Sequence, residues 1–306
     1  MRLDDFRPSE NVEDRRDQGP ISGGGGGMGL PIRGGHIGIG GIVIVLVVSY
    51  VTGINPLALL GVFDSVTGGG QETTSVSAPQ RSAGPARQDA SELFVAKVLR
   101  ATEETWPAVF AGQTNGVKYT PTNVVLFRGA TRSGCGAAES AMGPFYCPKD
   151  KKIYLDTEFF DEMRSRFQAC PETEGACAFA QTYVIAHEVG HHVQDLLGIL
   201  PKVHQAEEQA NNDADANRLS VALELQADCL AGVWAANTAQ KLRLQQSDIS
   251  GALQTAKAIG DDTLQKRSRG RVVPDSFTHG SSEQRQHWLT VGLQTGQISA
   301  CMKTFQ

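Results

Sequence analysis

The amino-acid sequence predicts an α+β domain, mainly helical with a small sheet, preceded by a disordered tail and one transmembrane helix. Two long runs of helix-forming residues, 179–195 and 217–240, contain no proline and predict helices. Two short runs rich in β-branched and aromatic residues, Asn123 to Arg128 and Lys152 to Leu155, are typical of strands. One almost unbroken apolar stretch lies far upstream of all four runs.

Residues 1–36 form the first segment, which mixes many charged residues and then runs into five glycines, Gly23–Gly27. Such a composition cannot bury enough apolar surface to fold, so we expect a disordered, glycine-rich cytoplasmic tail. A phosphate-binding loop would need Gly-Lys-Ser/Thr after the glycines, and the sequence has none there.

The apolar stretch begins at Ile37, is interrupted at Asn55-Pro56, and resumes as far as Val62. A bilayer-spanning helix needs roughly 20 apolar residues, so we predict a transmembrane anchor over 37–62. A cleaved signal peptide would not normally follow a long polar tail. A buried core strand would be shorter.

The arginines around this stretch predict its orientation. The tail before it contains Arg2, Arg7, Arg15, Arg16 and Arg33, whereas the first basic residues after it are Arg81 and Arg87. An excess of Lys and Arg marks the cytoplasmic side of a span. We therefore expect a single-pass protein of the cytoplasmic membrane, with its N-terminus in the cytoplasm and its folded domain outside. Residues 63–89, rich in Ser, Thr, Gly and Pro, predict a flexible linker.

The folded domain is expected at 90–306. Ser91 to Thr105 predicts an amphipathic helix that ends at Pro107. The two predicted strands come next, followed by a helix over Thr157 to Phe167 and a loop from Cys170 to Cys177. Everything after that loop is expected to be helical.

All six cysteines lie in this domain: Cys135, Cys147, Cys170, Cys177, Cys229 and Cys301. An even number in a domain placed outside the membrane indicates disulfides. We expect the local pairs Cys135–Cys147 and Cys170–Cys177, which flank short loops. Cys229 is either a plain core residue or the partner of Cys301, and the sequence does not decide between these.

The most informative motif is His187-Glu188-Val189-Gly190-His191. On a helix, His187 and His191 share one face and can direct their ring nitrogens to one point. A catalytic zinc has three protein ligands and an open position, and the two histidines supply two of the three. Glu188 lies beside them, where it can take a proton from a water activated by the metal. The alternative is a chance pentapeptide on a core helix.

A second pair of residues supports the metal interpretation. Glu224 and Asp228 are four residues apart in the run 217–240, and their neighbours are apolar. Two buried carboxylates without a cation are very costly, and a zinc ion removes that cost. Glu224 is therefore expected as the third ligand, with Asp228 accepting the outer N–H of a ligating histidine. An exposed acidic face is the alternative, but such faces usually include Lys or Arg.

The runs HEVGHH and ELQADC resemble the gluzincin pattern of thermolysin-like metallopeptidases. Together with the glycine-rich N-terminus and the apolar segment, they make the chain similar to the bacterial membrane-anchored neutral zinc metallopeptidase family. This resemblance implies a zincin-like metallopeptidase domain, Zn²⁺ as cofactor and hydrolysis of peptide bonds in a peptide or protein substrate. In zincins, strands precede the metal-binding helix, and an edge strand can pair with an extended peptide.

The segment from Thr278 to Arg285 resembles the H-P-x-x-x-x-R segment of integral-membrane gluzincins, with Gly280 where that pattern has proline. The resemblance implies that His279 donates to the oxyanion of the reaction. The alternative is a surface loop in which Ser281 or Ser282 caps the next helix.

Two other functions compete with peptide hydrolysis. One is a non-catalytic, zinc-stabilised membrane chaperone or assembly factor, and the other is zinc-dependent hydrolysis of a different bond. Glu188 favours catalysis, because proteins that lose activity usually lose the base. A formal net charge of −5 gives no basic footprint for nucleic acid.

Overall fold

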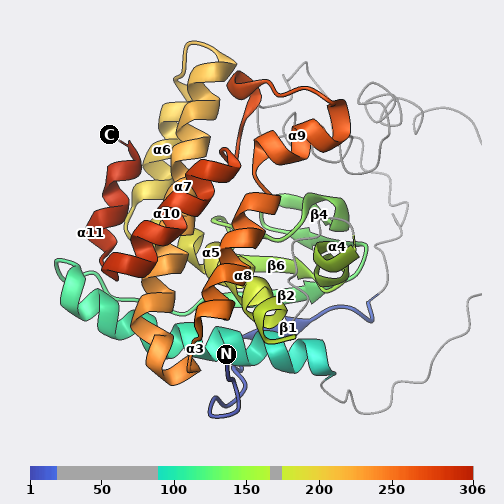
Figure 1. Ribbon diagram of the computed structural model, residues 1–306, viewed down its shortest axis with the longest axis vertical. Coiled ribbons are helices and arrows are strands. Elements are labelled where there is room, and N and C mark those ends of the chain that lie inside the picture. Colours follow the sequence, from blue (N-terminus) through green and yellow to red (C-terminus); the bar gives the residue numbers. More distant parts are fainter. Residues whose placement is uncertain (19–88, 166–173, 306) are drawn as a thin grey trace, which may run out of the picture. The chain divides into compact units, whose positions relative to one another are not determined.

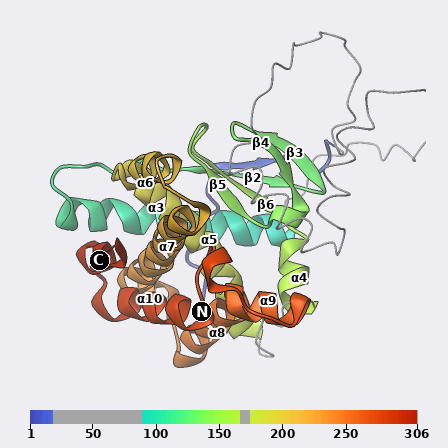
Figure 2. The same cartoon turned by 90° about the horizontal axis from the view of Figure 1, so that it is seen from above.

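The computed structural model describes residues 1–18, 89–165 and 174–305. These residues belong to one compact unit in which helices pack against a small mixed sheet (Figures 1 and 2). The predicted α+β class, mainly helical with a small sheet, is confirmed.

The sheet has the strand order β1-β2-β6-β5. Its members are β1 (Val12–Asp14), β2 (Asn123–Phe127), β6 (Lys152–Asp156) and β5 (Phe145–Cys147). The first three are parallel, whereas β5 pairs antiparallel with β6 and forms one edge. Strands β3 (Ala130–Ser133) and β4 (Gly136–Glu139) form a separate hairpin. Both predicted strands, β2 and β6, lie where the sequence placed them.

The helices are α3 (Ala90–Gln113), α4 (Phe159–Ser165), α5 (Glu174–Leu196), α6 (Ile199–Glu208), α7 (Asp213–Leu242), α8 (Gln246–Ala258), α9 (Asp261–Arg269), α10 (Ser282–Thr295) and α11 (Ile298–Cys301). Short 3-10 turns are η1 (Ser140–Met142), η2 (Pro274–Ser276) and η3 (Met302–Phe305). The predicted order is confirmed in the described residues, because the strands precede α5 and only helices and turns follow it. The loop predicted up to Cys177 ends earlier, since α5 begins at Glu174.

Helix α3 continues through Pro107, so the prediction that the helix ends there is wrong. A proline inside a helix costs about 3 kcal/mol because it removes a hydrogen bond and crowds the preceding turn. Beyond it, Val109 and Phe110 are buried in the main core, and Phe110 packs edge-on against Trp106 with ring centroids 5.9 Å apart. Burying large apolar side chains contributes about 1.5–3 kcal/mol each, which offsets the proline.

Helices α7 and α10 touch along their backbones. A Cβ atom added to Gly292 would lie 1.9 Å from the carbonyl oxygen of Cys229, and one added to Gly232 would lie 2.4 Å from that of Leu289. Only glycine permits this approach. It brings the backbones of the two helices into direct contact.

Two disulfides are present in the described residues. Cys229–Cys301 ties α7 to α11 with a Cα–Cα distance of 5.5 Å, which settles the question that the sequence left open. Cys135–Cys147 ties the residue before β4 to β5 at 5.8 Å, as predicted. The predicted pair Cys170–Cys177 lies outside the described residues, because Cys170 does.

The expectation of a disordered tail over 1–36 is wrong for residues 1–18. Phe6 is 5% exposed within the main core, and residues 12–14 form β1. Some of the charges that suggested disorder have partners, as Glu13 accepts from both Arg15 and Lys152. The rest of the predicted tail, the anchor at 37–62 and nearly all of the linker lie outside the described residues.

Within the described ranges, α7 is the one helix long and apolar enough to cross a membrane. Its most apolar window is 67% buried inside the domain, and it carries Glu224 and Asp228. Helix α7 is therefore a core helix of this fold.

Candidate metal centre

Helix α5 presents His187, Glu188 and His191 in the interior of the domain, and all three are buried. Gly190, inside the motif, faces α7, because a Cβ atom there would lie 2.9 Å from the carbonyl oxygen of Ala227. This glycine lets the two helices approach closely, so a side chain from α7 can reach both histidines.

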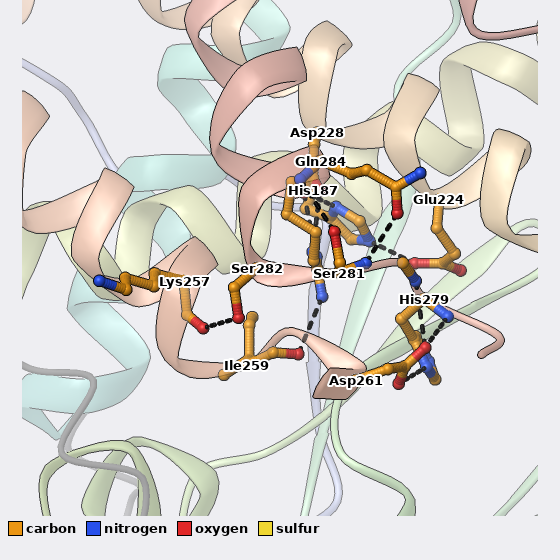
Figure 3. A network of polar contacts seen from close by, with 12 residues as sticks. His187, Glu224, Asp228, Lys257, Ile259, Asp261, His279, Ser281, Ser282 and Gln284 are labelled. Carbon is orange, nitrogen blue, oxygen red and sulfur yellow. Dashed lines mark hydrogen bonds and ion pairs between the residues drawn. The ribbon is translucent and has the colours of Figure 1, made fainter. Parts of the chain in front are cut away.

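That side chain is Glu224 (Figure 3). Its Oε2 lies 3.1 Å from Nε2 of His187, and its Oε1 lies 3.3 Å from Nε2 of His191. One possible ligand atom from each of these three residues lies within 4.8 Å of the other two. The structure thus brings together the three predicted ligands.

Each histidine is held through its other ring nitrogen. Nδ1 of His187 donates to Oδ1 of Asp228 at 2.8 Å, as predicted for Asp228. Nδ1 of His191 is 2.8 Å from Oε1 of Gln194, whose amide nitrogen donates to the carbonyl of Leu223. Both Nδ1 atoms therefore carry the proton, and both Nε2 lone pairs point to the proposed metal position.

Asp228 is the most heavily bonded carboxylate of the site. Arg285 on α10 donates to it through Nε at 2.8 Å and through Nη2 at 3.0 Å. Tyr183 donates its hydroxyl to Oδ1 at 2.5 Å. Sequence reasoning missed Tyr183 and Gln194, although both lie on the metal helix at helical spacing, four residues before His187 and three after His191. That spacing was the available signal.

The histidines and carboxylates of the site shift one another's pKa values. Burial lowers the pKa of His187, but Asp228 and Glu224 outweigh it and raise the pKa to about 10. Burial raises the pKa of Glu224, but His191 and His187 hold it well below its usual range. Without a metal, the carboxylates are thus ionised and protons occupy the histidines, so metal and protons compete for the same nitrogens.

Glu188 differs from the other carboxylates. It is buried, and its Oε2 accepts no hydrogen bond. Burial raises its pKa above the usual value for a glutamate. A buried carboxylate oxygen without a donor is costly in a purely structural role, and is typical of a group held ready for a proton.

His279 belongs to the loop before α10, and its side chain lies beside that of Glu224 (Figure 3). Oδ2 of Asp261 accepts the backbone N–H groups of Thr278, His279 and Gly280 at 2.8, 2.7 and 3.1 Å. This carboxylate supplies the rigidity that a proline would otherwise give, and Gly280 adopts φ +91°, which favours glycine. Ser281 also caps α10 through Gln284, so capping and a role for His279 coexist.

His192 is not among the candidate metal ligands. Its Nδ1 is 3.1 Å from the hydroxyl of Tyr146 on β5, and its Nε2 is 2.7 Å from the carbonyl oxygen of Thr120. It is buried and joins α5 to the edge of the sheet, rather than lying on the surface. Tyr146 also bonds Asp195 at 3.0 Å, so edge strand β5 lies against the metal helix.

Comparison with known proteins identifies the family. The profile of a family described as "Putative neutral zinc metallopeptidase" matches residues 1–305. The chain belongs to this family. It is 45% identical over 302 residues to the uncharacterized protein YpfJ of Escherichia coli K12, covering 98% of both chains. It is 42% identical over 223 residues to the uncharacterized protein Rv2575 of Mycobacterium tuberculosis H37Rv, covering 70% of this chain and 71% of that one. No solved structure matches.

The donor set fits the metal that the family name implies. Two imidazole nitrogens and one carboxylate oxygen, with a fourth position open, form a known catalytic zinc set. Glu188, with its free buried oxygen, directly follows His187 in the chain and precedes His191 by three residues. The family name thus implies zinc, and the His187, His191 and Glu224 cluster could bind it.

Proposed function

We propose that the protein is a zinc-dependent metalloendopeptidase, with His187, His191 and Glu224 as zinc ligands and Glu188 as general base. The observation that carries this proposal is the convergence of three ligand atoms beside a buried carboxylate oxygen that has no donor. A structural zinc site would use four protein ligands and would not need Glu188.

Zinc bound here would polarise the scissile carbonyl and lower the pKa of the attacking water. Glu188 accepts a proton from that water as its oxygen bonds to the carbonyl carbon. The same carboxyl group then gives the proton to the leaving amine as the C–N bond breaks. Burial raises its pKa above the usual glutamate value, which makes the carboxylate a stronger base for the first transfer.

Two further features support a peptide substrate. Strand β5 is an edge strand antiparallel to its neighbour, and its Tyr146 is tied to α5, so an added peptide strand would run beside the metal helix. In this proposal His279, whose backbone N–H donates to Asp261, is the donor to the oxyanion of the tetrahedral intermediate. Burial lowers the pKa of His279, but Asp261 outweighs it and keeps the ring protonated to higher pH.

The decisive variant is Glu188→Gln, which keeps the size of the side chain but cannot accept a proton at neutral pH. Zinc content and melting temperature should stay near wild type, whereas peptide cleavage should fall by about 10² or more. Glu208→Gln, at an exposed position of α6, is the matched control and should change neither. His187→Ala should instead abolish zinc binding, whereas His204→Ala, an exposed histidine, should not.

The competing function is a zinc-stabilised membrane chaperone or assembly factor without catalysis. It predicts that Glu188→Gln leaves the biological phenotype intact and that neither form cleaves a peptide library. Zinc retained at one ion per chain by His187→Ala combined with Glu224→Ala would contradict the ligand set itself. Attachment of the chain to the cytoplasmic membrane through residues 37–62 remains part of the proposal.

A further inference from the structure

The first eighteen residues are an integral part of the catalytic domain. Their earliest contact is an ion pair between the Met1 amino group and Asp248, which caps α8, at 2.7 Å with both side chains 2% exposed. The next backbone N–H, that of Arg2, donates to the carbonyl of Leu242 at the end of α7 at 2.7 Å. Phe6 lies in the core cluster that includes residues of α3, α5 and α7.

The middle of this segment is fixed to α3. Glu103 accepts the Ser9 hydroxyl at 2.5 Å and the Asn11 amide at 2.7 Å through the same Oε1. The backbone N–H of Ser9 also donates to the carbonyl oxygen of Ala96 at 3.0 Å. Ser9 is 4% exposed and Glu103 8%, so these bonds form away from water.

Its last part completes the sheet. Strand β1 pairs in parallel with β2, with Val12 opposite Val124. The backbone N–H of Val124 donates to the carbonyl oxygen of Asn11 at 2.9 Å, and the backbone N–H of Arg15 donates to that of Leu126 at 2.8 Å. Without β1, strand β2 would be an edge in the described sheet and would leave backbone groups unpaired.

These contacts cannot form across a membrane, since a bilayer has a hydrocarbon core of about 30 Å and each contact requires atoms within hydrogen-bond distance. We infer that residues 1–18 and residues 90–305 lie in the same compartment, and that this compartment is the oxidising, extracytoplasmic one. The chain between them, with the apolar residues 37–62, therefore begins and ends on one side of the membrane. A single crossing would separate β1 from β2.

The choice of side comes from the disulfides, Cys135–Cys147 and Cys229–Cys301, because disulfides persist in oxidising compartments and are rare in the cytosol. This inference replaces the expectation of a cytoplasmic N-terminus, which came from counting arginines. Two of those arginines have structural roles in the fold. Arg15 pairs with Glu13 at 2.7 Å, and Arg16 pairs with Asp14 at 2.6 Å and with Glu92 at 3.3 Å.

The test uses the full-length chain in intact spheroplasts and a membrane-impermeant maleimide polymer that shifts the protein on a gel. Glu10→Cys places a thiol on the exposed surface of the N-terminal segment, and Ser268→Cys places one on exposed α9. Wild type gives the background from its own cysteines. We expect both variants to shift without permeabilisation, and wild type to shift only after reduction.

Each other pattern contradicts part of the inference. If Ser268→Cys shifts in intact cells but Glu10→Cys shifts only after permeabilisation, a single crossing separates the two segments and the inference fails. If both shift only after permeabilisation, the shared compartment is the cytoplasm and the assignment of side fails. Hydrogen exchange of the purified full chain checks the docking independently. The Arg15 amide should exchange as slowly as amides of the central sheet, and fast exchange there would show that β1 is not paired.

Discussion

Arg285 is the cation that supports the metal centre most directly, and Arg285→Met tests that support. The change leaves Asp228, whose side chain is 0% exposed, with only His187 and Tyr183 as donors. Removing one partner of a buried ion pair costs about 3–5 kcal/mol. Burial raises the pKa of Asp228, but Arg285 and His187 lower it from 3.8 to about 2. This net decrease in the pKa of Asp228 corresponds to about 2 kcal/mol of folding free energy. Arg285→Met should lose more than that, because Asp228 stays buried without its arginine partner.

The assay is thermal unfolding together with zinc titration. For a domain of this size, Tm should fall by about 6–20 °C, at about 2–4 °C per kcal/mol. Zinc affinity should fall by about 10-fold to 100-fold, because Asp228 no longer holds His187 in place. A lowered carboxylate pKa stabilises the fold above pH 3.8, and this stabilisation is lost as pH falls toward 2. The difference in stability between wild type and Arg285→Met should therefore become smaller as the pH falls toward 2.

Arg218→Met is the matched control, because Arg218 is 68% exposed and its ion pair with Asp215 lies on the surface. It should leave Tm and zinc affinity unchanged. If Arg285 acts through Asp228, Asp228→Asn and Arg285→Met should not be additive in zinc affinity. Additive losses, or wild-type zinc affinity in Arg285→Met, would refute this reasoning.

Two further predictions concern the α7–α10 contact and the His279 loop. Gly292→Ala should lower stability by about 1–3 kcal/mol or more, because the new methyl group meets the backbone of α7. Gly112→Ala, also in a helix but with open space around it, should stabilise by about 0.5–1 kcal/mol in the same unfolding assay. Asp261→Asn should lower the pKa of His279 and shift the alkaline limb of kcat/KM to lower pH. Asp262→Asn should leave that limb in place, because Asp262 accepts from Ser282 instead.

Helical spacing is a local rule, so the sequence alone groups the candidate ligand residues into pairs. His187 and His191 must share a face of any helix that contains them, and the same is true of Glu224 and Asp228. What joins the two pairs is not local. The approach of α5 to α7 depends on Gly190 meeting Ala227, and no periodicity in either helix shows which residues will face each other.

The parts that sequence reasoning missed depend on contacts between distant segments. Strand β1 has three residues, and its partner β2 follows more than a hundred positions later, so its charged sequence resembled a disordered tail. Helix α3 continues through Pro107 because of burial, which the local sequence does not report. The hydrogen bonds that make Asp261 a brace for the His279 loop likewise come from the meeting of α9 with residues 278–280.

The disulfide Cys229–Cys301 connects stability, the metal centre and the compartment in one prediction. It links two cysteines that are 72 residues apart in the sequence. By lowering the chain entropy of the unfolded state, it should stabilise the fold by about 4 kcal/mol. Cys135–Cys147 closes a separation of 12 and is worth about 3 kcal/mol. Replacing either pair by alanine should therefore lower Tm by a similar amount, at about 2–4 °C per kcal/mol.

Only the Cys229/Cys301 variant should also bind zinc less tightly. Cys229 is 0% exposed and follows Asp228 on α7, so its removal leaves a void beside the carboxylate that holds His187. Zinc affinity should fall in the Cys229/Cys301 variant and stay at wild type in the Cys135/Cys147 variant, as measured by competition with a chelating dye. Equal zinc affinity in the two variants would show that the α7–α11 link does not support the metal centre. A Tm that is unchanged when both pairs are replaced would show that the disulfides do not stabilise the fold. Free thiols at these four cysteines in the untreated protein would remove their support for an oxidising compartment.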